Sequence, residues 1–88
     1  MEHVVNTRFS RGLKLAENCG IAIRYEYLHG QGGGICQINQ QPQLFIDLAL
    51  PPLDQLQLLE NSLQLVINEQ WPVPHLDQLV AWAESGNG

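Results

Sequence analysis

Residues 21–48 read IAIRYEYLHGQGGGICQINQQPQLFIDL, and this stretch decides the fold. In its first eight positions, every second residue from Ile21 onward is β-branched or aromatic, and Arg24 and Glu26 lie between them. One face of that segment therefore carries Ile21, Ile23, Tyr25 and Tyr27. A period of two in β-branched and aromatic residues predicts a strand over 21–28, with Ala22, Arg24 and Glu26 on its other face.

The rest of this stretch predicts two more strands separated by turns. Four of the five positions in 30–34 are glycine, a composition that favours a turn over regular structure. Residues 35–38 and 43–48 are predicted as short strands, and 39–42 as a second turn. Because short turns join all three strands, we expect an antiparallel meander.

An amphipathic helix is predicted before the strands. Four apolar side chains recur there at intervals of three or four positions: Val5, Phe9, Leu13 and Ala16. Asn6 or Thr7 can cap the start of this helix. Gly20 can adopt the left-handed conformation that closes its end.

Two helices are predicted after the strands. Pro51 and Pro52 suit a first helical turn, where the missing N–H group is not needed. The core-facing arc of this helix holds six apolar side chains: Leu53, Leu56, Leu59, Leu63, Val66 and Ile67. A last helix is predicted to begin at Pro74 or His75. We therefore expect residues 1–88 to form one small α+β domain, with both C-terminal helices packed on one sheet face.

Composition and charge bound the function. The chain has 88 residues, of which 44% are hydrophobic and 15% charged, which fits a single globular domain. No apolar run approaches the roughly 20 residues of a membrane span. The formal net charge is −5, and all four basic residues lie within the first 24 positions. Because binding to phosphates or anionic lipids needs cations, we expect neither nucleic acid nor membranes as partners.

The two cysteines indicate a compartment rather than a disulfide scaffold. The first ten residues lack the apolar stretch of a secretory signal, so we expect a reducing cytoplasm in which Cys19 and Cys36 are free thiols. A disulfide between Cys19 and Cys36 stays open as the alternative.

The glycine-rich turn is the candidate ligand loop. Successive glycine N–H groups can form an anion nest, and a histidine and a cysteine flank this one. The candidate residues are His29, Gly30, Gly32, Gly33, Gly34 and Cys36. Two metal ligands fall short of the four of a structural zinc site, so no metal and no cofactor are expected. A mobile hairpin tip, or a bulge where another backbone packs closely, is the simpler interpretation.

Enzyme chemistry has weak support in the sequence. Cys36 and His29 could form a thiol–histidine pair, with glycine amides as an oxyanion hole. Asp47 and Glu26 are candidate carboxylates, but we expect both to be solvated on the outer face of the sheet. We therefore expect no enzyme activity and assign no catalytic residue, with thiol chemistry at Cys36 as the remaining alternative.

A protein-interaction surface is the preferred interpretation. Leu58 and Leu65 lie about 80–100° off the core-facing arc of the second helix, on a side that solvent would otherwise contact. Trp82 lies beside the apolar stripe of the last helix. We expect Leu58, Leu65 and Trp82 to contact either another part of the fold or another chain, and we expect a non-catalytic interaction module or homodimer. A ligand-binding or metal-binding protein that uses the glycine-rich turn is the alternative.

Residues 20–56 resemble small bacterial proteins that share the pattern I-x-x-R-Y-E-x-L, G-G-G-x-C and L-F-x-D. The layout also resembles the N-terminal part of ImmA/IrrE-type metallopeptidases, in which a strand meander precedes the helix that carries HExxH. Residues 58–65 read LLENSLQL here, so Glu60 is present without the two histidines that would hold zinc. The resemblance therefore implies no peptidase activity.

Overall fold

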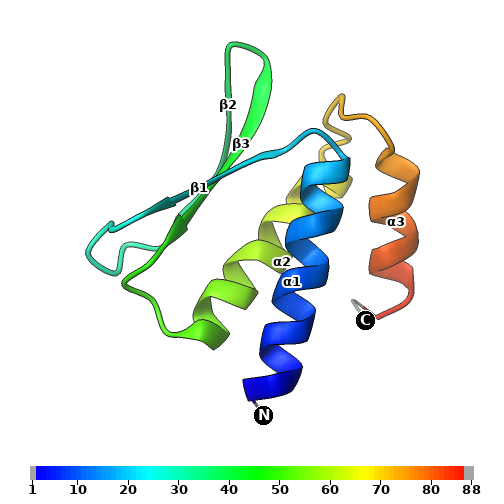
Figure 1. Ribbon diagram of the computed structural model, residues 1–88. Helices are drawn as coiled ribbons and strands as arrows, with labels where there is room; N and C mark the ends of the chain where they lie inside the picture. Colours follow the sequence, from blue (N-terminus) through cyan, green and yellow to red (C-terminus); the bar gives the residue numbers. More distant parts are fainter. Residues whose placement is uncertain (1, 87–88) are drawn as a thin grey trace.

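The computed structural model describes residues 2–86 and has an α+β fold, which confirms the predicted fold class (Figure 1). One helix precedes three strands, and two helices follow them. The elements are α1 (Glu2–Asn18), β1 (Ala22–Glu26), β2 (Gly33–Ile38), β3 (Gln41–Asp47), α2 (Pro52–Asn68) and α3 (Leu76–Glu84).

The strands form a mixed sheet in the order β1-β3-β2, so the predicted antiparallel meander is wrong. β1 pairs with β3 in parallel, and β2 pairs with β3 antiparallel. Only the turn at Asn39 and Gln40 is a tight hairpin, and both residues have the positive φ that a two-residue hairpin loop favours. The glycine-rich segment instead crosses the end of β3, which leaves the central position to β3. That position buries Leu44 and Ile46, the most apolar pair of the sheet.

The two faces of the sheet have different surroundings. Ile23 and Ile35 are both in register with Leu44, so these three side chains share one face. α1 and α2 pack against that face, as Figure 1 shows. The opposite face carries Arg24 and Phe45, which are in register and in contact, with the Arg24 guanidinium 5.7 Å from the centre of the Phe45 ring.

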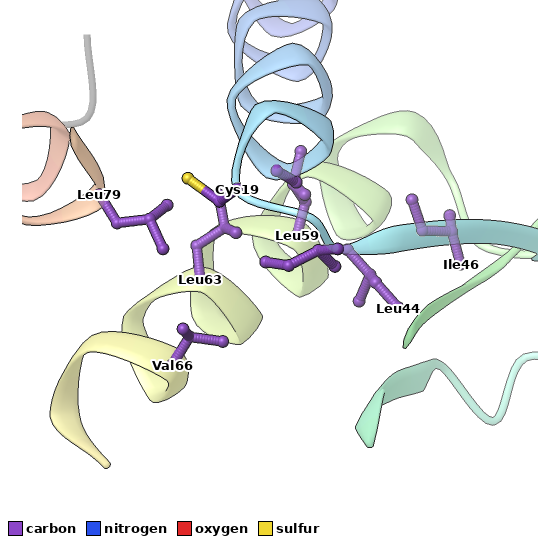
Figure 2. Packing of buried hydrophobic residues seen from close by; sticks show 9 residues of the cluster. Cys19, Leu44, Ile46, Leu59, Leu63, Val66 and Leu79 are labelled. Carbon is purple, nitrogen blue, oxygen red and sulfur yellow. The ribbon is translucent and has the colours of Figure 1, made fainter. Parts of the chain in front are cut away.

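The core lies between the helices and the sheet (Figure 2). Its buried members come from every layer: Ala16, Cys19, Ile21, Leu44, Ile46, Leu59, Leu63, Val66 and Leu79. The predicted arc of α2 is confirmed by the burial of Leu56, Leu59, Leu63 and Val66. Leu53 differs, because it lies in the first turn of α2 and is exposed.

α1 and α2 approach closely. A Cβ atom on Gly12 would lie 2.7 Å from the Leu59 Cδ2 atom, so the absence of a side chain at Gly12 allows this contact. Next to it, Arg8 Nη2 donates to Glu60 Oε1 at 2.7 Å and to Oε2 at 2.6 Å. α1 extends back to Glu2 and so begins before the predicted cap at Asn6 or Thr7, while its end before Gly20 is as predicted.

α3 packs against α2 instead of lying directly on the sheet, which corrects the predicted arrangement of the two C-terminal helices. Leu79 is its fully buried residue. The Cys19 thiol donates to the His75 carbonyl at 3.5 Å, and this contact joins the end of α1 to the start of α3. The helices therefore form one layer against the sheet, with α3 at its edge.

Candidate functional site

The segment between β1 and β2 passes over the carboxyl end of β3, where Asp47 lies beneath it. The Asp47 side chain is fully buried. Its Oδ1 accepts the N–H groups of Leu28 and Ala49, both at 2.9 Å, and its Oδ2 accepts the N–H of Gly32 at 3.1 Å. The prediction of a solvated Asp47 is therefore wrong, because the crossing segment covers this end of the sheet.

The hydrogen bonds from backbone N–H groups keep the Asp47 carboxylate ionised. Burial by itself raises the pKa of the Asp47 carboxyl, but the backbone N–H groups of Leu28, Gly32, Ala49 and Gly30 outweigh it, and the pKa is lowered. The glycine-rich segment thus forms an anion nest, and the anion that occupies it is the carboxylate of this chain. An external anion would have to compete with Asp47 for the same N–H groups.

Gly33 has a separate role at the start of β2. A Cβ atom there would overlap the carbonyl oxygen of Phe45 in β3, a backbone atom that cannot move aside. Its φ is also positive, at +90°. Gly32 has a similar φ of +100° but faces open space. The close approach of two backbones, one of the interpretations of this turn, is therefore present at Gly33.

The cysteines are both free, which excludes the alternative of a Cys19–Cys36 disulfide in this structure. Cys19 is buried, and this burial, followed by the charge of Asp77, raises the pKa of its thiol. Cys36 is exposed on β2. Within residues 2–86, no group of three or more histidine, cysteine and acidic side chains is placed to hold a metal ion.

A hollow of about 390 Å³ lies beside β2 and β3. Its lining is mostly apolar and consists of Leu28, Gly33, Gly34, Ile35, Cys36 and Phe45. Three of the predicted loop residues therefore contribute to one surface, whereas His29 does not line it. His29 is exposed on the crossing segment and has a positive φ of 59°.

The predicted interaction surface of Leu58, Leu65 and Trp82 is less exposed than the spacing of these residues in the sequence indicated. Leu65 is 37% exposed, but Leu58 is only partly accessible. Trp82 packs against the core. Trp82 thus contributes to the packing of the core, Leu58 is half-buried, and Leu65 is the most exposed of the three side chains.

Two large aromatic side chains are exposed at the free edge of the sheet, Tyr25 in β1 and Tyr27 directly after the end of this strand. Tyr25 is 47% exposed and Tyr27 is 72% exposed. β1 pairs with β3 on one side only, because it is the first strand in the sheet order. The alternation in 21–28 identified this strand correctly, but its edge position follows from the strand order, which the sequence pattern did not contain.

Neither protein-family models nor curated proteins nor solved structures gave a match to this chain. None of the helices within residues 2–86 is long and apolar enough to cross a membrane.

The helix that follows the strands, α2, contains Glu60, and the Glu60 carboxylate forms an ion pair with Arg8 from α1. Among residues 2–86, the candidate surfaces for function include the β1 edge, the hollow and the exposed part of α2.

Proposed function

We propose that this protein is a non-catalytic protein-interaction module whose partner is a second copy of itself. The observation that carries the proposal is the free edge of β1, where Tyr25 is exposed and is followed, just beyond the strand, by the exposed Tyr27. The outward-facing N–H and C=O groups of an edge strand can pair with another strand. Proteins often protect such edges with charged side chains or proline. Residues 21–28 contain no proline, and their two charged side chains, Arg24 and Glu26, are partly exposed and have opposite signs.

Three properties support a protein partner in a reducing cytoplasm. Both cysteines are free thiols. The net charge of −5 disfavours nucleic acid and anionic membranes as partners. Two of the four basic side chains, Arg8 and Arg24, also bond to the carboxylates of Glu60 and Glu26. The cytoplasmic location is part of this proposal.

Light scattering over a concentration series tests self-association. We expect the wild type to reach twice the 9.9 kDa mass of one chain. The Tyr25→Ser/Tyr27→Ser variant removes the exposed aromatic surface and is expected to dimerise at least about tenfold more weakly, a change of 1.4 kcal/mol in binding free energy.

Leu65→Glu is the matched control, because it changes an exposed apolar residue in the C-terminal half of α2 and leaves β1 intact. We expect this variant to dimerise like the wild type. A dimer that only Leu65→Glu disrupts would move the interface to α2, in agreement with the sequence pattern. A wild-type chain that stays monomeric up to about 1 mM would contradict the proposal.

The hollow beside β2 and β3 supports a second candidate function, the binding of a small apolar ligand. Its volume of about 390 Å³ lies within the range of ligand pockets, and its lining is mostly apolar. A ligand that binds the folded state at 100 times its Kd stabilises it by about 2.7 kcal/mol. We expect a small aromatic compound such as indole to raise the Tm if this candidate is correct.

Cys36→Phe provides the control for the ligand test. Cys36 is exposed on β2, and a phenyl ring there would fill part of the hollow without entering the core. It should remove the effect of indole on the Tm. An unchanged Tm of the wild type across a panel of small aromatic compounds would contradict this candidate.

A further inference from the structure

We propose that two copies of the chain pair through their β1 edges, antiparallel, with the two-fold axis at Tyr25. The two three-stranded sheets then join into one six-stranded sheet. This inference rests on the proposed self-association and specifies its surface and its register. Three features of β1 carry it: the direction of its backbone groups, the order of its charges and the exposure of its aromatic rings.

The backbone groups of β1 set which residues can pair. The Glu26 carbonyl accepts the Leu48 N–H at 2.8 Å, so Glu26 directs its backbone groups toward β3. The N–H and C=O groups of successive strand residues point to opposite sides, so those of Ile23 and Tyr25 point to the free edge. Tyr27 directly follows β1, and in the proposed dimer it continues this alternation. Tyr25 can therefore exchange two hydrogen bonds with Tyr25 of a second copy, and Ile23 can do so with Tyr27.

The charges of β1 select this register. Arg24 and Glu26 flank Tyr25 and lie on one face of the strand. With Tyr25 opposite Tyr25, Arg24 of each copy lies directly across from Glu26 of the other copy. The adjacent registers that also align outward-facing backbone groups place Arg24 opposite Arg24, or Glu26 opposite Glu26. Like charges directly opposite destabilise a strand pair, whereas opposite charges stabilise it.

The two charged side chains are available for this exchange. In the single chain Arg24 Nη2 lies 3.3 Å from Glu26 Oε1, with 55% and 43% of the two side chains exposed. The dimer replaces the two intrachain bonds, one in each copy, by two cross-strand bonds related by the two-fold axis. The Arg24–Glu26 ion pairs therefore contribute more to the choice of strand register than to the affinity of the dimer.

The aromatic side chains favour a second copy as the partner. Tyr25 and Tyr27 lie on the opposite face of β1 from the charges, by the alternation of the strand. At the two-fold axis the Tyr25 rings become cross-strand neighbours, and Ile23 lies opposite Tyr27. Cross-strand pairs of aromatic and β-branched residues stabilise sheets. An antiparallel second copy presents Glu26, Tyr25 and Arg24 opposite Arg24, Tyr25 and Glu26. A second copy therefore supplies both the opposite charges and the aromatic contact.

Charge reversal tests the register. We expect Arg24→Glu and Glu26→Arg each to raise the Kd of the dimer at least about tenfold, because each variant places like charges opposite one another twice. The double variant Arg24→Glu/Glu26→Arg restores both attractive pairs and should return the Kd to within about threefold of the wild type. Sedimentation velocity over a concentration series measures all three values.

Mixing the two single variants gives a sharper result. In a mixed dimer, Glu at position 24 of one copy faces Arg at position 26 of the other, and the second pair is Glu26 with Arg24. The two variants, each dissociated alone at a given concentration, are therefore expected to form a dimer when mixed. Circular dichroism and Tm measurements confirm that each variant is folded.

The outcomes separate this inference from the proposed function. A wild-type dimer that no charge variant changes, and that Leu65→Glu disrupts, overturns the β1 register while self-association stands. A wild-type monomer overturns both. If a charge variant does not fold, hydrogen exchange of the wild type still tests whether the β1 edge pairs. Protection of the Tyr25 and Tyr27 amides must then rise with protein concentration. Amides at the free edge of β2 should stay unchanged. Concentration-independent exchange at Tyr25 overturns the register.

Discussion

Asp47→Ala is expected to lower the Tm by more than about 10 °C. The substitution removes the acceptor of three backbone N–H groups, those of Leu28, Gly32 and Ala49, which lie beneath the crossing segment. A buried donor without a partner destabilises the folded state more than the mean value of a hydrogen bond suggests. Thermal unfolding followed by circular dichroism measures the effect.

Asp47→Asn separates the contribution of the hydrogen bonds to Oδ1 from that of the hydrogen bond to Oδ2. The remaining Oδ1 can still accept the N–H groups of Leu28 and Ala49, while the amide nitrogen would face the N–H of Gly32. We therefore expect a smaller loss than in Asp47→Ala. Asp54→Ala changes an exposed carboxylate and should leave the Tm nearly unchanged. Equal Tm values for Asp47→Ala and Asp54→Ala would show that the carboxylate does not hold the segment.

The same carboxylate gives a pH dependence of known sign. Although burial raises the pKa of Asp47, its backbone hydrogen bonds lower it overall from the ordinary value of 3.8. Between the lowered pKa and 3.8 the unfolded state binds more protons, so stability rises with pH in that window. The Tm difference between wild type and Asp47→Asn should be constant above about pH 5 and shrink below 3.8.

Gly33→Ala is expected to reduce the free energy of unfolding by about 3 kcal/mol. The new Cβ would overlap the carbonyl oxygen of Phe45, so β2 must move away from β3 at its first residue. The φ of +90° adds strain for any residue with a side chain. For a domain of this size the change corresponds to a fall in Tm of roughly 15 °C.

Gly32→Ala is the matched control for this steric effect. Gly32 has nearly the same φ, +100°, but nothing lies within 4 Å of an added Cβ. Its substitution keeps the N–H that Asp47 accepts, so it should reduce stability by only about 1 kcal/mol of backbone strain. Equal losses at Gly32 and Gly33 would mean that φ, not the contact with Phe45, requires glycine at the start of β2.

Part of the candidate site followed from local patterns, although the predicted turn over 30–34 is wrong at Gly33 and Gly34, which begin β2. The alternation of 21–28 predicted β1, and the glycine content of 30–34 predicted an irregular segment with the properties of an anion nest. The occupant of that nest was not predictable, because Asp47 lies 15 positions after Gly32 and looked like a solvated residue of an alternating strand. The burial of Asp47 depends on which segment passes over the end of its strand.

In the helices, too, local patterns predicted some features and the tertiary structure decided others. The spacing of apolar residues in α2 predicted its buried arc, but Leu58 and Leu65 were assigned to one surface that the fold divides. Leu58 is partly buried, whereas Leu65 is exposed, and α2 packs against both α1 and α3. A helical wheel gives directions around one helix and contains no information on which neighbours lie there.

The sequence by itself determined the order and type of the elements, the two ends of the sheet-forming stretch and most of the core. These properties depend on interactions between residues near each other in the chain, namely capping, turn formation and the alternation of apolar side chains. The tertiary structure decided the strand order β1-β3-β2, and with it the burial of Asp47 and the free edge that exposes Tyr25. Strand order depends on which arrangement buries the most apolar strand at the centre, a property of the whole chain that no local pattern contains.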